Sequence, residues 1–106
     1  AVIQPSLFEG WSTVIEDTKV IGRPLFVSDL SVHKEQLNSY DRVWFFDPGS
    51  TNSLVECLGY RWPGLSAGPE INLEKKAIQA AEKTRNITAS RFIELAKEAI
   101  SLAESR

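Results

Sequence analysis

Glu9 and Gly10 lie in a loop, residues 5–12, that we expect to connect a strand to a helix. The carboxylate of Glu9 can accept hydrogen bonds from hydroxyl groups such as those of a sugar. Gly10 allows a ligand to approach the backbone closely, and the free N–H groups in the first turn of the following helix attract anions. A strand, a loop with one glycine and a helix occur throughout α/β proteins, so these features alone do not select a function.

Three short apolar runs predict the strands that position this loop: residues 1–4, 25–27 and 43–46. Each run is continuous rather than alternating, which is typical of buried strands. A helix-forming segment separates each run from the next, so we expect parallel strands joined by right-handed crossovers. The sequence therefore predicts an α/β fold with about three parallel strands and flanking helices. In such a sheet, ligands bind beyond the carboxyl ends of the strands.

Capping signals set the bounds of the first expected helix. Thr13 and Glu16 have the spacing of a capping box, and Gly22 stands where a C-terminal glycine is typical. These residues predict a helix over residues 13–21, and Pro24 prevents its continuation.

Further along the chain, Ser31 predicts the N-cap of a short helical turn within residues 31–38. Another helix is expected to start at Ser50 or Thr51 and to end near Leu58.

The C-terminal part of the chain is expected to be a loop followed by helices. Residues 61–69 are rich in Pro and Gly, which favours a loop. Residues 70–83 and 88–104 each predict a helix, and the second has a wide apolar stripe.

Composition restricts the class of protein. The chain has 106 residues, of which 42% are hydrophobic and 25% charged, with a formal net charge of −2, and these values are ordinary for one soluble domain. Neither half is basic enough to indicate a nucleic-acid surface, and no run is long enough to span a bilayer. The chain has no methionine and begins with Ala1, so we expect it to be part of a longer protein or a processed one.

Four segments together resemble the C-terminal domain of retaining GT-B glycosyltransferases of the family-four type, also called glycosyl transferases group 1. These segments are PSLFEGWSTVIED at residues 5–17, GRP at 22–24, SDLSVHKEQ at 28–36 and FDP at 46–48. The resemblance covers residues 1–60. It implies that residues 1–60 are part of a Rossmann-like nucleotide-sugar-binding domain, and that residues 61–106 are the loop and C-terminal helices of the same domain.

The resemblance also implies the site residues. In the family, a Glu and a second acidic residue eight positions later bind the donor, and here these positions are Glu9 and Asp17. Glu9 would contact the donor sugar as the catalytic carboxylate, and Asp17 would hold the ribose of the nucleotide. The implied donor-binding set is Glu9, Gly10, Trp11, Ser12, Thr13 and Asp17.

Asp17 departs from the family pattern, in which this position is usually Glu. Asp is one methylene shorter, so Asp17 must approach the ribose more closely or bind through water. The neighbouring Glu16 is turned by about 100° around the helix, and we expect it to pair with Thr13 in the capping box.

The implied function is retaining transfer of a sugar from a nucleotide-sugar donor to a glycan or lipid-linked acceptor, in an enzyme of the bacterial type. The family's basic pair for the diphosphate and its acceptor domain lie outside these 106 residues. The expected partners are therefore the donor, the acceptor and the N-terminal part of the same enzyme. We expect no cofactor, no isolated activity, an edge strand open to pairing with another chain, and a location in the cytoplasm or at the inner face of its membrane.

Two alternatives remain open at this point. Another GT-B nucleotide-sugar enzyme, such as an epimerase, would share this part of the site. A non-catalytic α/β module would instead bind a partner through its open sheet edge.

Several residues have simpler interpretations. His33 and Cys57 are the only His and Cys, so neither indicates a metal site. We expect a structural role for His33, and we expect Cys57 to be a buried, small apolar side chain in a helix rather than a nucleophile. Trp11 could contribute its side chain to the core or its backbone to the donor. The charged residues Glu74, Lys75, Lys76, Glu82, Lys83 and Arg85 fit a solvated helix face.

Overall fold

The computed structural model covers residues 1–106 and has an α/β fold with a three-stranded parallel sheet. The strands are β1 (Val2–Gln4), β2 (Leu25–Ser28) and β3 (Val43–Phe46), in the order β1-β2-β3. Val2 pairs with Leu25, and Leu25 pairs with Val43, so the carboxyl ends of all strands meet at one edge of the sheet.

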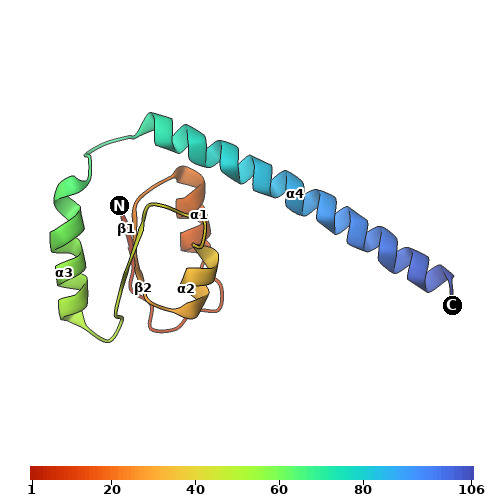
Figure 1. Cartoon of the computed structure of the whole chain (residues 1–106), viewed down its shortest axis with the longest axis horizontal. Helices are drawn as coiled ribbons and strands as arrows, with labels where there is room; N and C mark the ends of the chain where they lie inside the picture. Colours follow the sequence, from red (N-terminus) through yellow and green to blue (C-terminus); the bar gives the residue numbers. More distant parts are fainter.

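Helices cover both faces of the sheet, as Figure 1 shows. The helices α1 (Thr13–Ile21) and α2 (Ser31–Gln36) lie on one face, and α3 (Thr51–Arg61) lies on the other. A short 3₁₀ turn, η1 (Trp62–Gly64), follows α3 and precedes the long helix α4 (Ile71–Glu104). The predicted α/β class, its parallel strands and its helical C-terminus are therefore confirmed.

The core is small and lies mainly around β2. All residues of β2 are buried, and Leu25 and Val27 pack with Ile15 of α1 and with Leu37. On the opposite face, the ring centroids of Phe26 and Trp44 lie 5.0 Å apart. β1 and β3 are the edge strands, and the expectation that residues 1–4 form a buried strand is wrong. Val2 and Gln4 are only partly buried and Ile3 is 41% exposed, because no strand lies beyond β1.

The bounds of α1 are as predicted, but its N-cap is different. Ser12 Oγ accepts from the N–H of Ile15 at 3.3 Å, so Ser12 is the N-cap and Thr13 is the first helical residue. The capping box of Thr13 with Glu16 is therefore wrong, because Glu16 sits one position too far along the helix to reach back. Gly22 ends α1 with φ of 68°, a left-handed conformation in which a side chain would be strained.

The start of α2 shows the same kind of shift, whereas the start of α3 is as predicted. The N-cap of α2 is Leu30, whose side chain makes no capping bond, and Ser31 is the first helical residue, so the predicted Ser31 cap is wrong. Ser50 caps α3 by accepting from the N–H of Ser53 at 3.2 Å, as one of the two predicted starts requires. Because α3 ends at Arg61, the predicted loop is reduced to η1 and residues 65–70.

The C-terminal helix is continuous, so the predicted break between residues 83 and 88 is wrong. Residues 84–87 contain no Pro or Gly that would stop a helix. The start of α4 is held to the sheet domain by ion pairs of Arg42 with Glu70 at 2.6 Å and of Arg23 with Glu74 at 3.1 Å.

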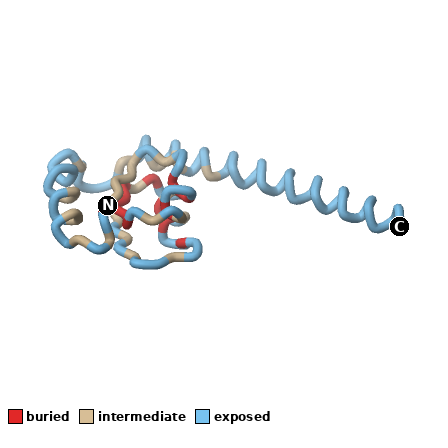
Figure 2. The backbone as a smooth tube through the Cα atoms, turned by 60° about the horizontal axis from the view of Figure 1, so that its bottom comes forward, coloured by how far each residue is buried: buried red, intermediate tan, exposed pale blue.

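Beyond these anchors, α4 extends away from the sheet domain. Every residue from 82 to 106 is exposed, as Figure 2 shows. The radius of gyration is 18.0 Å, against about 13 Å for a compact domain of this length. No helix, including α4, combines the length and the apolar character needed to cross a membrane.

Candidate functional site

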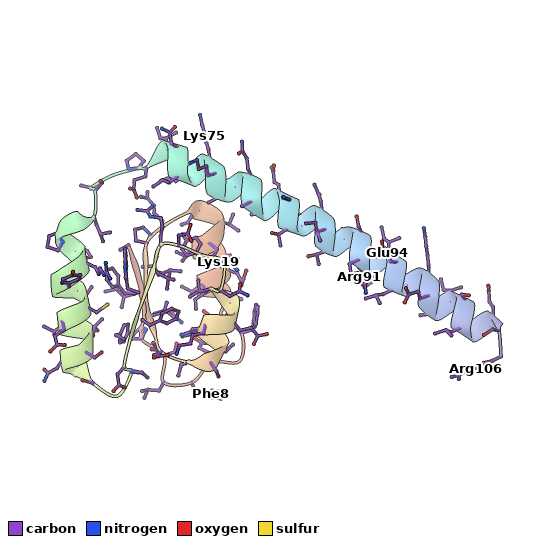
Figure 3. All side chains as sticks on the ribbon, in the orientation of Figure 1. Phe8, Lys19, Lys75, Arg91, Glu94 and Arg106 are labelled. Carbon is purple, nitrogen blue, oxygen red and sulfur yellow. The ribbon has the colours of Figure 1, made fainter.

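The candidate site lies at the carboxyl ends of the strands, where the loop of residues 5–12 follows β1. The loop connects Gln4 at the end of β1 to the start of α1. In Figure 3, Phe8 marks this loop, at the end of the sheet domain opposite Lys75 and the start of α4. The fold therefore separates the candidate site from the C-terminal helix.

Glu9 is held in a fixed position by residues on its N-terminal side. Gln4 Nε2 donates to Glu9 Oε1 at 2.9 Å, and Ser6 Oγ donates to the same oxygen at 2.7 Å. Gln4 Nε2 also donates to Ser6 Oγ at 3.1 Å, which closes a small polar triangle. Both bonds to Glu9 use Oε1, so Glu9 Oε2 has no protein partner and is free to accept from a ligand.

These hydrogen bonds also affect the ionisation of Glu9. They stabilise the carboxylate, so the pKa of Glu9 lies below its ordinary value of 4.5. Ser6 has the largest effect and Gln4 the second, desolvation opposes them, and the imidazole of His33 lowers the pKa slightly further. Glu9 is therefore ionised at neutral pH, which suits an acceptor of hydroxyl hydrogen bonds.

The start of α1 supplies unused backbone donors. Ser12 Oγ occupies the N–H of Ile15, whereas the N–H groups of Thr13 and Val14 have no protein acceptor. In the loop, the N–H groups of Gly10 and Trp11 are also without a protein acceptor. Together with the positive end of the helix dipole, these groups form a surface suited to an anion.

The remaining predicted residues lie on α1 or beside it. Trp11 is 56% exposed, so its side chain does not belong to the core. Thr13 and Asp17 are four residues apart and share one exposed strip of α1. The Asp17 carboxylate forms no hydrogen bond or ion pair within the chain, so it is available to a ligand.

Glu16, in contrast, is turned toward α2. It accepts from Gln36 Nε2 at 3.1 Å and pairs with Lys19 at 3.3 Å. The structure thus separates the two adjacent carboxylates, with Asp17 open to solvent and Glu16 engaged within the fold.

Gln36 is a residue of this region that the sequence interpretation missed. Although it is only 3% exposed, its amide binds both backbone groups of Ser12. Ser12 N–H donates to Gln36 Oε1 at 3.1 Å, and Gln36 Nε2 donates to Ser12 C=O at 3.0 Å. No local signal in the sequence indicates this contact, because the two residues are 24 positions apart.

His33 is fully buried, as the structural interpretation expects. Its Nδ1 lies 2.8 Å from the C=O of Ser28, and because a carbonyl can only accept, Nδ1 carries the proton. Nε2 is buried without a partner. His33 thus ties the first turn of α2 to the end of β2.

Other candidate chemistry lies outside this region. No cluster of three or more His, Cys, Asp or Glu side chains is placed to hold a metal ion. Cys57 is partly buried in α3, and desolvation raises the pKa of its thiol.

The main surface grooves do not lie at Glu9. One of about 400 Å³ lies between α1 and α4, and another of about 470 Å³ lies beside residues 65–69. The candidate site is therefore an open surface at the edge of the sheet.

Comparison of the chain with protein-family models, with curated proteins and with solved structures finds no match.

Proposed function

We propose that this chain forms part of the nucleotide-sugar donor site of a retaining glycosyltransferase with the GT-B architecture. The main observation is that the carboxylate of Glu9 is fixed by two neighbours with one oxygen free, just before a helix start with unused N–H groups. The Glu9 carboxylate can accept hydrogen bonds from sugar hydroxyls, and the unused N–H groups can donate to phosphate oxygens. The family resemblance of residues 5–17 and 28–36 supports the same interpretation.

In this proposal the donor diphosphate lies at the start of α1, and its sugar lies beside Glu9. When the bond between the anomeric carbon and the diphosphate oxygen breaks, negative charge grows on the diphosphate. The backbone N–H groups of Gly10, Trp11 and Thr13 stabilise that charge without reorganising. Glu9 holds the sugar hydroxyls, which keeps the sugar in a reactive position as it gains oxocarbenium character.

Asp17 is proposed to accept hydrogen bonds from the ribose hydroxyls of the donor nucleotide. Its carboxylate stands one helical turn beyond Thr13 on the same strip of α1 and has no partner within the chain. A ligand whose phosphates contact the start of α1 can therefore extend along this strip toward Asp17. Ser12 contributes through its backbone position, because its side chain is occupied in capping.

The proposed enzyme completes this site with its N-terminal part. Two exposed features support a further packing partner. The edge of β1 is open, with Ile3 exposed at its centre, and the outer half of α4 contacts nothing in this chain. The acceptor is a glycan or a lipid-linked sugar in this proposal, and the isolated chain is expected to bind donor but not to transfer sugar.

Titration of the ¹⁵N-labelled chain with UDP-, GDP- and ADP-sugars tests this proposal by NMR. We expect shifts at the amides of residues 9–14 and at Asp17, and the loss of these shifts in Glu9→Gln. The matched control is Glu35→Gln, since Glu35 is an exposed carboxylate of α2 that forms no hydrogen bond or ion pair within the chain. Shifts confined to other residues, or none with any nucleotide sugar, would contradict the donor site.

A non-catalytic interaction module is the second candidate, and the open edge of β1 is the observation that favours it. Its expected property is self-association or capture of a strand by β1, which Ile3→Lys should weaken because a charge on an edge opposes pairing. Sedimentation of the wild-type and variant chains, without any nucleotide present, distinguishes this candidate from the donor site.

A further inference from the structure

Gln36 is a buried polar side chain that joins α2 to the loop of the candidate site. Its amide accepts from Ser12 N–H at 3.1 Å and donates to Ser12 C=O at 3.0 Å, which is the pattern of two paired backbone groups. Gln36 Nε2 also donates to Glu16 Oε1 at 3.1 Å. The amide of Gln36 therefore binds the residue that caps α1 and a carboxylate in the first turn of the same helix.

Lys19 completes this network from the other side of α1. Lys19 Nζ donates to the backbone C=O of Gln36 at 2.8 Å and pairs with Glu16. Every polar atom of the Gln36 amide thus has a partner, although the residue is almost fully buried. A buried network in which all groups are satisfied is rigid, because any displacement leaves one group unpaired at a substantial energetic cost.

We propose that Gln36 is a positioning residue for the ligand site, and this inference rests on the proposed function. Ser12 stands between the unbonded N–H groups of Trp11 and Thr13. By fixing both backbone groups of Ser12, Gln36 sets the direction in which these donors point before a ligand arrives. A loop ordered in advance does not lose conformational entropy on binding, so Gln36 raises ligand affinity without touching the ligand.

Two substitutions of Gln36 distinguish the loss of its hydrogen bonds to Ser12 from the introduction of a negative charge at this position. Gln36→Leu removes both bonds to Ser12 while keeping an apolar side chain of similar size. Gln36→Glu keeps an oxygen that can accept from Ser12 N–H, but its ionised form cannot donate to Ser12 C=O and repels Glu16. When protonated, the introduced carboxyl can donate to Ser12 C=O and restore both hydrogen bonds to Ser12. The charged or titratable groups near it are Glu16 and Lys19 of α1 and His33 of its own helix.

Thr18→Val is the matched control. Thr18 is also buried on α1, and its Oγ1 donates to Val14 C=O at 2.7 Å, but its side chain forms no hydrogen bond with Gln36 or the loop. This variant loses a buried hydrogen bond of the same helix, so it reports the effect of lower stability alone.

The first measurement is hydrogen exchange of the Ser12 amide by NMR in the full chain without ligand. We expect Gln36→Leu to accelerate this exchange at least about tenfold more than Thr18→Val does. For Gln36→Glu we expect fast exchange, corrected for the intrinsic pH effect, at about pH 8, and recovered protection once the pH falls below the pKa of the introduced carboxyl. Equal acceleration in Gln36→Leu and Thr18→Val, or no pH-dependent recovery, overturns the role of Gln36 in fixing Ser12.

The second measurement is affinity for the nucleotide sugar that gives the largest NMR shifts with the wild-type chain. We expect Gln36→Leu to weaken binding about tenfold and Thr18→Val to leave it within about twofold. Unchanged affinity in Gln36→Leu, with its Ser12 amide exposed, overturns the positioning role. If the wild-type chain binds no nucleotide sugar, the proposed donor site fails and the positioning role fails with it, while the exchange data still decide whether Gln36 fixes Ser12.

Discussion

Ser6 Oγ donates a hydrogen bond of 2.7 Å to Glu9 Oε1, and this bond orients the carboxylate and lowers its pKa. Gln4 reinforces it from the end of β1. Since both donors bind the same oxygen, the second oxygen of Glu9 has no hydrogen-bond partner within the chain. A polar triangle formed by three residues of one short segment thus prepares a carboxylate for a ligand.

The first prediction concerns the pKa of Glu9. Ser6→Ala removes the largest cause of its lowering, so the pKa should rise toward its ordinary value of 4.5. Carbon-detected NMR titration of the Glu9 carboxyl measures this directly. An unchanged pKa in Ser6→Ala would show that the hydrogen bond is absent in solution.

The same bond predicts how stability varies with pH. The pKa of Glu9 is lower in the folded chain than in the unfolded chain, so ionised Glu9 contributes stability above the unfolded value. This contribution is lost as the pH falls through the folded pKa. Urea unfolding between neutral and acidic pH should therefore show a smaller acid loss in Glu9→Gln than in the wild type, with Glu35→Gln as the control.

Another prediction concerns turnover in the complete enzyme that we propose. Glu9→Gln keeps the size of the side chain but removes the charge that orients the sugar, so kcat/KM should fall by at least about a hundredfold. Steady-state kinetics with the preferred donor give this ratio. Activity within a few-fold of the wild type, at unchanged stability, would remove Glu9 from the site.

The third prediction separates Asp17 from its neighbour Glu16. Asp17→Ala should weaken nucleotide binding about tenfold and leave the free energy of unfolding nearly unchanged, since the side chain is exposed and unbonded. Asp17→Glu, which restores the usual residue of the resembled family, should bind at least as well as the wild type. Calorimetric titration with the nucleotide diphosphate alone measures both, and equal binding by Asp17→Ala would exclude the ribose contact.

The residues whose structure was predictable are those governed by local chemistry. Continuous apolar runs predicted the parallel strands, and Gly22 and Ser50 predicted a helix end and a helix start, because a glycine and a hydroxyl act on their own backbone neighbours. The assignment failed at the start of α1, where Ser12 and Thr13 can both cap. The contact of Ser12 with Gln36 selects Ser12, and a contact between residues 24 positions apart cannot be inferred from spacing.

The candidate site was predictable to a similar extent. The motif placed Glu9 before a helix start and placed Asp17 on that helix, but it did not predict the bonds of Gln4 and Ser6 to Glu9. Whether Glu16 or Asp17 faces outward depends on where α2 packs, since Gln36 and Lys19 draw Glu16 inward. The break expected in α4 had no Pro or Gly to cause it, and an exposed helix continues without one.

The final prediction concerns the junction of α1 with α4. Gly22 has φ of 68°, and a Cβ at this position would lie 3.0 Å from Ala77 Cβ and 3.1 Å from the C=O of Leu73. Gly22→Ala should therefore lower the free energy of unfolding by about 2 kcal/mol or more, from backbone strain and from contact with α4. Gly59→Ala is the control, because Gly59 lies within α3 with open space around it, and this variant should stabilise the chain by up to about 1 kcal/mol. Urea unfolding of both variants measures the two changes in the free energy of unfolding. A neutral Gly22→Ala would contradict both the left-handed conformation of Gly22 and its close contact with α4.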